Sequence, residues 1–366
     1  MPRKRRILAY HIGSLGDTIA SVPALRVIRR KYGDRADIYM LSDRGGAEFV
    51  KASAVLQGSG LVDHFLEYGR GASRFQKLLG AMEAWATVVR HRFDAVVYLM
   101  QSERSARAVK RDKLFFGLCG IRQRLGFEPF TQEFLYPRDA NGIPQVVEHE
   151  ALRRAKRLQK AGFDALQEGE LDAPFLRAPE TERANAKAWL EEHRRFPDKI
   201  LVGFCPGTKM SAKVWPTDRV AEIGRRLISD GRFEIVIVGG PADAKLAEKL
   251  VLEWGAGLNA AGCFSVMGSA AVLHQCRFVF AVDSGPMHVA AVGGVPCVAL
   301  FSSVDYPGRF HPLGRNHVLL RNTVPCAACR LQVCPVEGHP CMTGITVEQV
   351  WQAVKQLCGS IDIPPM

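Results

Sequence analysis

Short apolar runs alternate with longer segments of mixed polarity along most of the chain. Runs of four to six apolar residues are typical of buried strands, and apolar residues spaced three or four apart are typical of helices. In the first half the predicted strands are 6–10, 36–41, 61–66, 94–99 and 122–127, and the predicted helices are 17–31, 47–56, 74–90 and 148–161. In the second half the predicted strands are 200–204, 234–238, 277–282, 297–300 and 317–320, and the predicted helices are 217–228, 242–254, 265–275, 287–292 and 346–357. This alternation predicts the α/β class with parallel, doubly wound sheets.

The alternation occurs twice, with a break around residues 165–180. This stretch carries acidic residues and two prolines and shows little periodicity, so we interpret it as a linker. A chain of 366 residues is long enough for two domains of ordinary size. We therefore expect two Rossmann-like domains, residues 1–170 and 171–345, that face a central cleft, with a closing helix in residues 346–366.

One stretch of the second half stands out. The apolar residues Val279–Val282 predict a buried strand, and Asp283–Pro286 predict a turn with a helix starting at its end. Free backbone N–H groups and the positive end of the helix dipole would suit a phosphate there. The alternative is an ordinary capped turn, with His288 as a buried core histidine.

Targeting signals are not evident in the sequence. No apolar run approaches the roughly 20 residues that a transmembrane helix needs. Met1–Arg6 is basic, but the apolar run that follows ends at His11, too early for a signal peptide. Ten cysteines are compatible with a reducing compartment. We expect a cytoplasmic protein.

The net charge of +12 is unevenly distributed. Residues 1–160 carry 29 Lys and Arg against 16 Asp and Glu, whereas residues 161–366 carry 20 against 21. The basic half suggests an acidic partner, such as a phosphorylated or anionic-lipid surface, with the densest cluster at Arg104, Arg107, Lys110, Arg111 and Lys113. No nucleic-acid-binding signature accompanies it, so we expect no nucleic acid partner. A solvated basic face without a partner is the alternative.

Candidate chemistry in the first half lies where the first strand meets the first helix. Gly13 and Gly16 would let the backbone approach a ligand, and Asp17 opens the helix. The dinucleotide pattern G-x-G-x-x-G is absent, which argues against a nicotinamide cofactor. Asp17 has no evident partner in the sequence. It is either a first-turn acid that stabilises the helix dipole or a general base at the carboxyl edge of the sheet.

Two further loops of the second half follow predicted strands. Thr208 belongs to a Gly-Thr turn that leads through Lys209 and Lys213, a composition that suits a diphosphate. Asp243 follows the next strand and could accept hydrogen bonds from a ribose. Each loop alone would be more typical of a structural turn. Together with Asp283–His288 they indicate one ligand-binding edge.

These motifs together resemble the heptosyltransferase family of bacterial lipopolysaccharide assembly, glycosyltransferase family 9. The resemblance runs through nearly the whole chain. The matching pieces are Gly13–Asp17 with Pro23–Leu25, Pro206–Pro216, Val238–Gly240, Asp283–His288 and Cys341–Ile345. It implies the two-domain GT-B fold and inverting transfer of heptose from ADP-L-glycero-D-manno-heptose to a lipopolysaccharide core acceptor.

The resemblance also implies roles for individual residues. Asp17 would be the base that deprotonates the acceptor hydroxyl, and Gly13 and Gly16 would lie next to the substrate. The donor nucleotide-sugar would contact Thr208, Lys213, Asp243, Phe264, Asp283, Ser284, Gly285 and His288, with Lys209 as an additional phosphate contact. Asp243 stands where the family often has a glutamate that binds the ribose, and Phe264 falls near the adenine-contact position.

An inverting mechanism follows from these roles. Attack from the face opposite the diphosphate would invert the anomeric carbon, while Lys213 and the helix end at Ser284 stabilise the leaving ADP. No Asp-x-Asp motif for a divalent cation is present, so we expect no cofactor and no metal. The alternatives are a transferase of the same fold that uses another nucleotide-sugar, and a non-catalytic module that binds a nucleotide-sugar or a lipid head group. We expect peripheral contact with the inner face of the cytoplasmic membrane, without insertion.

Four cysteines gather near the end of the second half. Cys326, Cys329, Cys334 and Cys341 have the spacing C-x2-C-x4-C-x6-C, which raises the question of zinc or an iron–sulfur cluster. A single C-x2-C is weaker evidence than two such pairs, and three nearby prolines stiffen the loop. We interpret the cysteine loop, residues 326–341, as structural and expect it to carry no metal.

Overall fold

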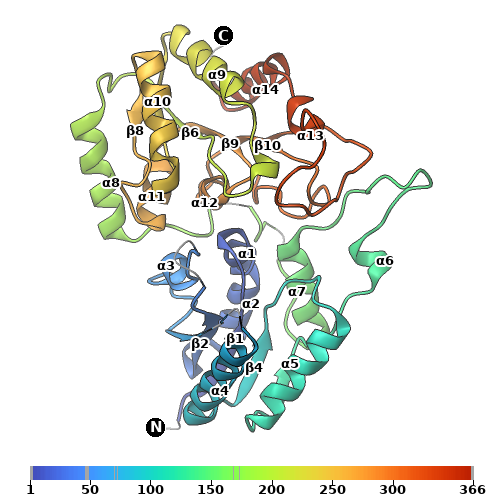
Figure 1. Cartoon of the computed structure of the whole chain (residues 1–366). Coiled ribbons are helices and arrows are strands. Elements are labelled where there is room, and N and C mark those ends of the chain that lie inside the picture. The colour runs from blue at the N-terminus through green and yellow to red at the C-terminus, as the bar shows by residue number, and fades with distance from the viewer. Residues whose placement is uncertain are drawn as a thin grey trace. The chain divides into compact units, whose positions relative to one another are not determined.

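The chain forms two compact units. The computed structural model describes residues 3–45, 49–69, 71, 73–167, 169–172 and 174–363. Unit 1 consists of residues 1–137 and 147–170, and unit 2 of residues 138–146 and 171–366 (Figure 1). The excursion of residues 138–146 into unit 2 is not indicated by the sequence pattern. Helix 150–160 therefore belongs to unit 1 although it follows this excursion.

Unit 1 is built on a sheet of parallel strands in the order β3-β2-β1-β4-β5. The strands are β1 (Arg5–Tyr10), β2 (Ala36–Asp43), β3 (His64–Tyr68), β4 (Ala95–Tyr98) and β5 (Gln123–Leu125). The middle strands β1 and β4 are apolar along most of their length and buried, as expected for strands covered on both faces.

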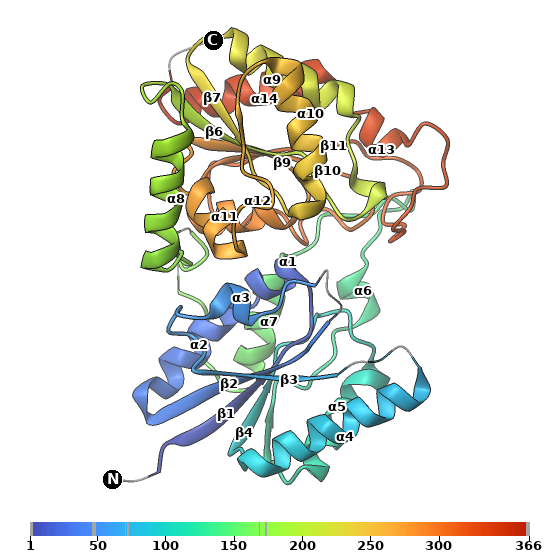
Figure 2. The same ribbon diagram turned by 60° about the vertical axis from the view of Figure 1, so that its left-hand side comes forward.

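Helices surround this sheet. They are α1 (Leu15–Ile19), α2 (Val22–Tyr32), α3 (Ser53–Leu56), α4 (Arg74–His91), α5 (Ala106–Leu118), α6 (Gln132–Leu135) and α7 (Glu150–Lys160). Val88 of α4 and Val109 and Phe116 of α5 share one buried cluster with residues of β1 and β4, so α4 and α5 cover the same face of the sheet (Figure 2). Helix α2 packs against α7.

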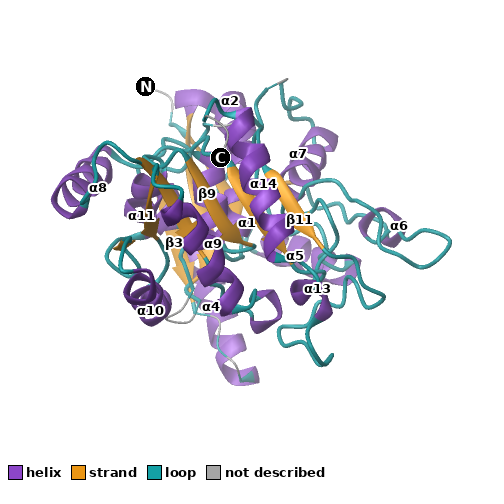
Figure 3. Ribbon diagram, turned by 90° about the horizontal axis from the view of Figure 1, so that it is seen from above, coloured by secondary structure: helices purple, strands orange, loops and turns teal. Residues whose placement is uncertain are grey.

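Unit 2 has a sheet of parallel strands in the order β11-β10-β9-β6-β7-β8. The strands are β6 (Ile200–Cys205), β7 (Phe233–Ile237), β8 (Leu258–Asn259), β9 (Phe278–Val282), β10 (Cys297–Phe301) and β11 (Val318–Arg321). The helices are α8 (Glu180–His193), α9 (Thr217–Ser229), α10 (Ala244–Trp254), α11 (Val266–Leu273), α12 (Gly285–Val292), α13 (Pro340–Thr343) and α14 (Val347–Ser360). Figure 3 shows β9 and β11 among the strands in orange, with helices beside them.

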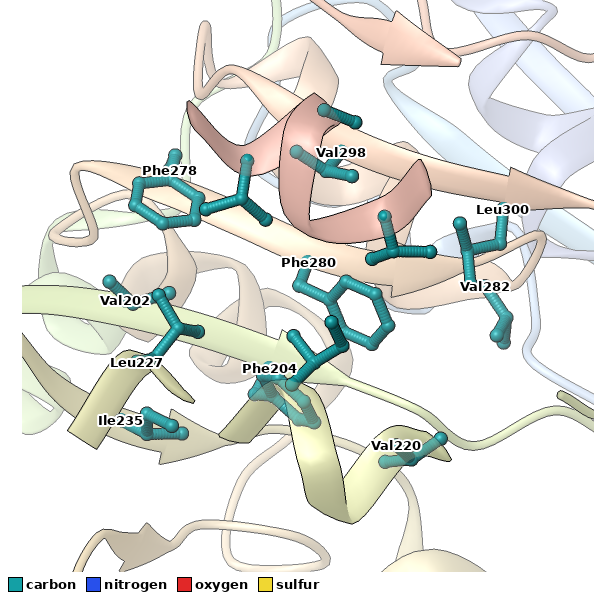
Figure 4. Packing of buried hydrophobic residues seen from close by; sticks show 14 of the residues in the cluster. Val202, Phe204, Val220, Leu227, Ile235, Phe278, Phe280, Val282, Val298 and Leu300 are labelled. Atoms are coloured by element: carbon teal, nitrogen blue, oxygen red, sulfur yellow. The ribbon is translucent and has the colours of Figure 1, made fainter. Parts of the chain in front are cut away.

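The core of unit 2 joins the sheet to its last helix. Phe204 of β6 and Phe280 of β9 stack with ring centroids 4.6 Å apart (Figure 4). Val350 and Leu357 of α14 belong to the same buried cluster. The last helix is therefore part of the unit 2 core and does not form a separate closing segment.

Two predicted helices differ from the structure. The helix predicted over 17–31 is two helices, α1 and α2, because Pro23 has no N–H to donate to the carbonyl of Ile19. The helix predicted over 47–56 was wrong for residues 49–52, and only Ser53–Leu56 is helical. Residues 47 and 48 of that prediction lie outside the described part of the chain.

Five helices and strands were missed, namely α5, α6, α8, β8 and α13. The largest is α8, of which Ala186 and Leu190 alone are fully buried, so its apolar periodicity is weak.

The predicted α/β class with two doubly wound parallel sheets is confirmed. Within the described ranges, no helix has both the length and the apolar character that crossing a membrane requires.

Candidate functional site

The winding of the unit 1 sheet reverses between β1 and β4. These strands are neighbours in the sheet, and Tyr10 pairs with Tyr98 at their carboxyl ends. Ligands of open α/β sheets bind outside the carboxyl ends of the strands at such a switch point. The segment after β1 carries Gly13, Gly16 and Asp17, so the fold places all three predicted residues at this edge.

Asp17 is buried in the first turns of α1, with 5% of its surface exposed. Its Oδ2 accepts hydrogen bonds from the backbone N and the Oγ of Ser14, each at 2.9 Å. Gly13 is required here, because a Cβ at this position would lie 2.4 Å from Cβ of Asp17. The position of the Asp17 carboxylate is therefore set by two residues of the loop, Gly13 and Ser14.

A buried arginine completes the surroundings of Asp17. Arg154 of α7 donates from Nη1 to the backbone carbonyl of Asp17 (2.6 Å) and from Nη2 to its Oδ1 (3.3 Å). Its Nε donates to Oε1 of Glu150 at 3.2 Å. Glu150 in turn accepts from the backbone N and the Oγ of Ser102, after β4, each at 2.6 Å. One polar network thus joins the loops after β1 and β4 to α7.

Sequence reasoning missed this network. We found no partner for Asp17 in the sequence, whereas the structure gives it Ser14 and Arg154. The available signal was the spacing of Glu150 and Arg154, which is the i,i+4 spacing of a helical ion pair. That spacing normally indicates an exposed pair, and it contains no information about residue 17.

His11 lies on the far side of the same network. Its Nε2 is 3.1 Å from Oγ1 of Thr18, and its Nδ1 is 3.3 Å from Oγ of Ser21. Burial, and then the positive charge of Arg154, lower the pKa of His11 to about 4. The imidazole is therefore neutral near pH 7, and it supplies hydrogen bonds without adding a second positive charge beside Arg154.

The winding of the unit 2 sheet reverses between β6 and β9, where Cys205 pairs with Ala281. The loop after β6 carries Thr208 and Lys213, and the turn after β9 carries Asp283. Nζ of Lys213 lies 2.7 Å from Oδ2 of Asp283. The two predicted loops therefore meet at the switch point, joined by an ion pair.

The residues on both sides of Lys213 are hydrogen-bonded to residues 332 and 345. The backbone N of Ala212 donates to the carbonyl of Gln332 at 3.0 Å. Nε1 of the buried Trp215 donates to the carbonyl of Ile345, also at 3.0 Å. Lys213 thus extends from a loop whose two sides are held in place.

Helix α12 begins at the same edge. Its N-cap residue is Ser284, followed by Gly285 and Pro286. Oγ of Ser284 is buried and has no hydrogen-bond partner among the described residues, so this hydroxyl does not cap the helix. The first N–H groups of a helix have no intrahelical acceptor and favour an anion. His288, one turn later, is buried beside the ring of Phe310.

Asp243 and Phe264 occupy the neighbouring loops. Oδ2 of Asp243 accepts from the backbone N of Gly240 at 2.8 Å, and a Cβ at Gly207 would lie 2.0 Å from its Oδ1. Asp243 therefore touches the loop after β6 while it also closes its own turn. The ring of Phe264 meets that of Trp189 on α8, edge to face, with centroids 5.5 Å apart.

Two basic residues near Asp283 were not predicted. Burial lowers the pKa of His311 and of Arg321, and the negative charge of Asp283 acts in the opposite direction on both. Both residues come from the region after β10, which has no ligand-binding signal in the sequence. Lys213, which is paired with Asp283, is therefore one of three basic residues that interact electrostatically with this carboxylate.

The cysteine loop packs within unit 2. Cys326 and Cys329 are exposed, Cys334 is partly buried and Cys341 is buried, and none forms a disulfide. Burial raises the pKa of the Cys341 thiol, and the other three cysteines of the loop raise it further. In the described part of the chain, no three His, Cys, Asp or Glu side chains converge as metal ligands would.

Comparison with known proteins identifies relatives of the chain. A model of glycosyltransferase family 9 (heptosyltransferase) matches residues 83–339. Lipooligosaccharide heptosyltransferase 2 of Haemophilus ducreyi is 29% identical over 195 residues, which are 50% of this chain and 55% of that protein. Lipopolysaccharide heptosyltransferase 2 of Salmonella typhimurium is 30% identical over 181 residues, which are 46% of this chain and 49% of that protein. The chain thus spans about half the length of these two relatives.

Solved structures extend the similarity of the fold. A glycosyl transferase family 9 protein from Veillonella parvula aligns with a TM-score of 0.72 at 21% identity, covering 97% of both chains. ADP-heptose lps heptosyltransferase II of E. coli aligns with a TM-score of 0.66 at 19% identity, covering 98% of this chain and 99% of the other. The architecture is accordingly GT-B, with two doubly wound α/β domains.

Replacement of Arg154 tests the buried network. Arg154→Leu removes a buried cation that is bonded to the carboxylates of Asp17 and Glu150, and we expect the free energy of unfolding to fall by about 3–5 kcal/mol. Arg154→Lys keeps the positive charge but not the forked geometry of the guanidinium group, so its free energy of unfolding should fall by a smaller amount. Urea unfolding followed by circular dichroism measures both changes.

The matched control is Lys156→Leu on the same helix, where an exposed lysine pairs with Glu148. Exposed pairs contribute at most about 1 kcal/mol. Equal stability of the Arg154→Leu and Lys156→Leu variants would contradict a structural role for the network.

Proposed function

The chain belongs to glycosyltransferase family 9, and we propose that it transfers heptose from ADP-L-glycero-D-manno-heptose to a lipopolysaccharide core acceptor with inversion. The family match over residues 83–339 is the observation that carries this proposal. The names of its relatives, lipopolysaccharide and lipooligosaccharide heptosyltransferases, supply the donor sugar and the class of acceptor. The rest of the proposal assigns roles to the two switch points.

Unit 1 supplies the base. Asp17 accepts two hydrogen bonds on Oδ2 and one on Oδ1, and a carboxylate has about four acceptor directions. One direction therefore remains for the acceptor hydroxyl. Asp17 takes the hydroxyl proton as the oxygen attacks the anomeric carbon from the face opposite the diphosphate, so the configuration inverts.

Unit 2 holds the donor and stabilises the leaving group. The bond between the anomeric carbon and the diphosphate breaks, and negative charge grows on ADP. Lys213, the Ser284 hydroxyl and the first N–H groups of α12 lie at one edge and suit that charge. Thr208, Gly285 and His288 complete the phosphate and sugar contacts, and Lys209 adds a further positive charge.

The nucleoside lies along the neighbouring loops in this proposal. Asp243 contacts the ribose, and Phe264 contacts the adenine. Asp243 has the position for this role because it touches the loop after β6. Because Oδ2 of Asp243 accepts the hydrogen bond from Gly240, Oδ1 is the carboxylate oxygen that lies against the loop after β6.

The acceptor is anionic and membrane-associated in this proposal. The basic excess of the first half complements such an acceptor. Arg107, Lys110 and Lys113 are exposed on α5, whereas Arg104 and Arg111 pair with the buried Asp112. We place the protein in the cytoplasm, in peripheral contact with the inner face of the cytoplasmic membrane.

Removing the base should leave binding intact. Asp17→Asn keeps the size of the side chain, and we expect turnover to fall by about 10²-fold or more, the scale of a lost general base. ADP binding should not change, because the nucleotide contacts come from unit 2. Rapid-quench assays of transfer and calorimetric titration of ADP measure the two effects.

The control for this change is Asp34→Asn, at an exposed position of the same unit. It should transfer heptose at the normal rate. Turnover of the Asp17→Asn variant within a few-fold of normal would exclude Asp17 as the base.

The donor pocket should prefer ADP over UDP and GDP. Lys213→Ala removes a phosphate contact and also leaves Asp283 without its closest cation, so we expect ADP to bind at least about tenfold more weakly. Lys249→Ala, at an exposed lysine of α10, is the matched control. Equal or tighter binding of UDP in calorimetry would assign the protein to another donor class.

Transfer should not require a divalent cation. Fixed cationic groups such as Lys213 take the part that a metal plays in transferases with an Asp-x-Asp motif. We expect EDTA to leave turnover unchanged and elemental analysis of protein purified without chelator to give only traces of zinc and iron. About one zinc per chain, or the iron content of a cluster, would contradict the expectation that the protein carries no metal.

A further inference from the structure

Helix α4 packs on the sheet through its small residues. Gly80, Ala84 and Val88 recur every four residues and are the fully buried positions of the helix. Residues four apart lie on one stripe of a helix. The contact with the sheet is therefore narrow and involves little side-chain volume.

The large apolar residues of α4 lie on the opposite side and face solvent. They are spaced three or four apart, so they too form one stripe. The α4 stripe consists of Phe75, Leu78, Leu79, Met82, Trp85 and Val89. Phe75 is 68% exposed and Met82 is 58% exposed. Single exposed apolar residues are ordinary on protein surfaces, but a continuous stripe of this kind indicates a partner.

Helix α5, on the same face of the sheet, adds to this surface (Figure 2). Leu114 and Leu118 are exposed one turn apart, and Leu118 is 70% exposed. Arg107 and Lys110, earlier on this side of the helix, are exposed as well. Apolar and basic side chains thus occur together on α5 as they do on α4.

The charge of the two helices is almost entirely positive. Residues 73–92 and 105–118 contain eight Lys and Arg and two Asp and Glu. Both acids are paired with arginines. Glu83 pairs with Arg44 and accepts a hydrogen bond from the backbone N of Gly69. The buried Asp112 pairs with Arg104 and Arg111. The surface is therefore amphipathic and cationic.

We propose that α4 and α5 form a membrane-docking surface that takes an anionic lipid bilayer, with the α4 stripe inserted among the lipid head groups. An interfacial helix has this composition, with aromatic and aliphatic residues on one face and basic residues at its borders. Arg74 and Arg90, at the two ends of α4, are placed to meet lipid phosphates. Charge complementarity selects the bilayer over a second copy of the chain, which would bring the same positive charge to the interface.

This inference deepens the proposed function, because an acceptor that resides in a membrane has to be met at the membrane surface. It also changes the expected mode of contact. The basic residues alone predict binding without insertion, which salt should abolish. An inserted apolar stripe predicts a component of binding that remains when the charges are screened.

Vesicle sedimentation separates these contributions. We expect the full chain to bind phosphatidylcholine vesicles that contain about 30% phosphatidylglycerol, and to bind pure phosphatidylcholine much more weakly. Raising the salt from about 0.1 M to about 0.5 M should weaken binding without removing it. The double variant Leu78→Gln, Met82→Gln should bind about tenfold more weakly and lose the salt-resistant part. Leu252→Gln, at an exposed leucine of α10, is the control and should bind normally.

Trp85 reports insertion directly, because it is the only tryptophan before residue 189. Brominated acyl chains should quench part of the tryptophan fluorescence, and Trp85→Phe should remove that quenching while the protein still sediments with the vesicles. Quenching that persists in Trp85→Phe would place the inserted segment elsewhere and overturn the proposal.

Two other results would also overturn it. One is equal vesicle binding by the wild type and the Leu78→Gln, Met82→Gln variant. The other is a dimer in light scattering without lipid that this variant abolishes, since a second copy would then cover the stripe. Heptose transfer to a water-soluble core oligosaccharide, measured in parallel, tests the proposed function by itself. Loss of transfer with normal vesicle binding, or the reverse, identifies which proposal fails.

Discussion

The buried guanidinium of Arg154 is the interaction on which the architecture of unit 1 depends. An ion taken from water costs several kcal/mol unless its hydrogen bonds are met, and Arg154 meets them with Asp17, Ser21 and Glu150. Asp17 and Ser21 lie more than 130 residues before Arg154 in the chain. The cost of burying the ion therefore fixes how α7 lies against α1, and with it the direction of the Asp17 carboxylate.

Unit 2 also contains a buried ion that needs a partner, but here the ion is a carboxylate. Asp283 follows the buried strand β9 and is itself buried, so it needs a cation, and Lys213 from the loop after β6 supplies one. The loop that carries Lys213 is hydrogen-bonded to residues 332 and 345, and the ion pair with Asp283 holds the ammonium group at the sheet edge. A diphosphate that entered here would meet Lys213 already in place, which reduces the entropy lost on binding.

The sequence predicted the parts of the structure that depend on local pattern. Buried parallel strands are nearly continuous apolar runs, and the glycines, prolines and capping residues after them mark the carboxyl edge, so Asp17 and Asp283 could be placed at sheet edges. Partners were not predictable, because Arg154 and Asp17 come together only when α7 folds back after the excursion into unit 2. Nor did the pattern separate Arg104, paired with buried Asp112, from the exposed Lys110 nearby.

Helix α4 shows why periodicity alone misassigns a buried face. Its apolar residues have the spacing of a core-facing stripe, and a reader of the sequence would place Phe75, Met82 and Trp85 against the sheet. The structure puts Gly80, Ala84 and Val88 there instead. The small residues let the helix pack closely on the sheet, which it contacts at β3, while the large apolar residues stay exposed to solvent. A helix that leaves its larger apolar face uncovered is stabilised when a low-dielectric surface covers that face, and a lipid bilayer offers one that also pairs with the basic residues around it.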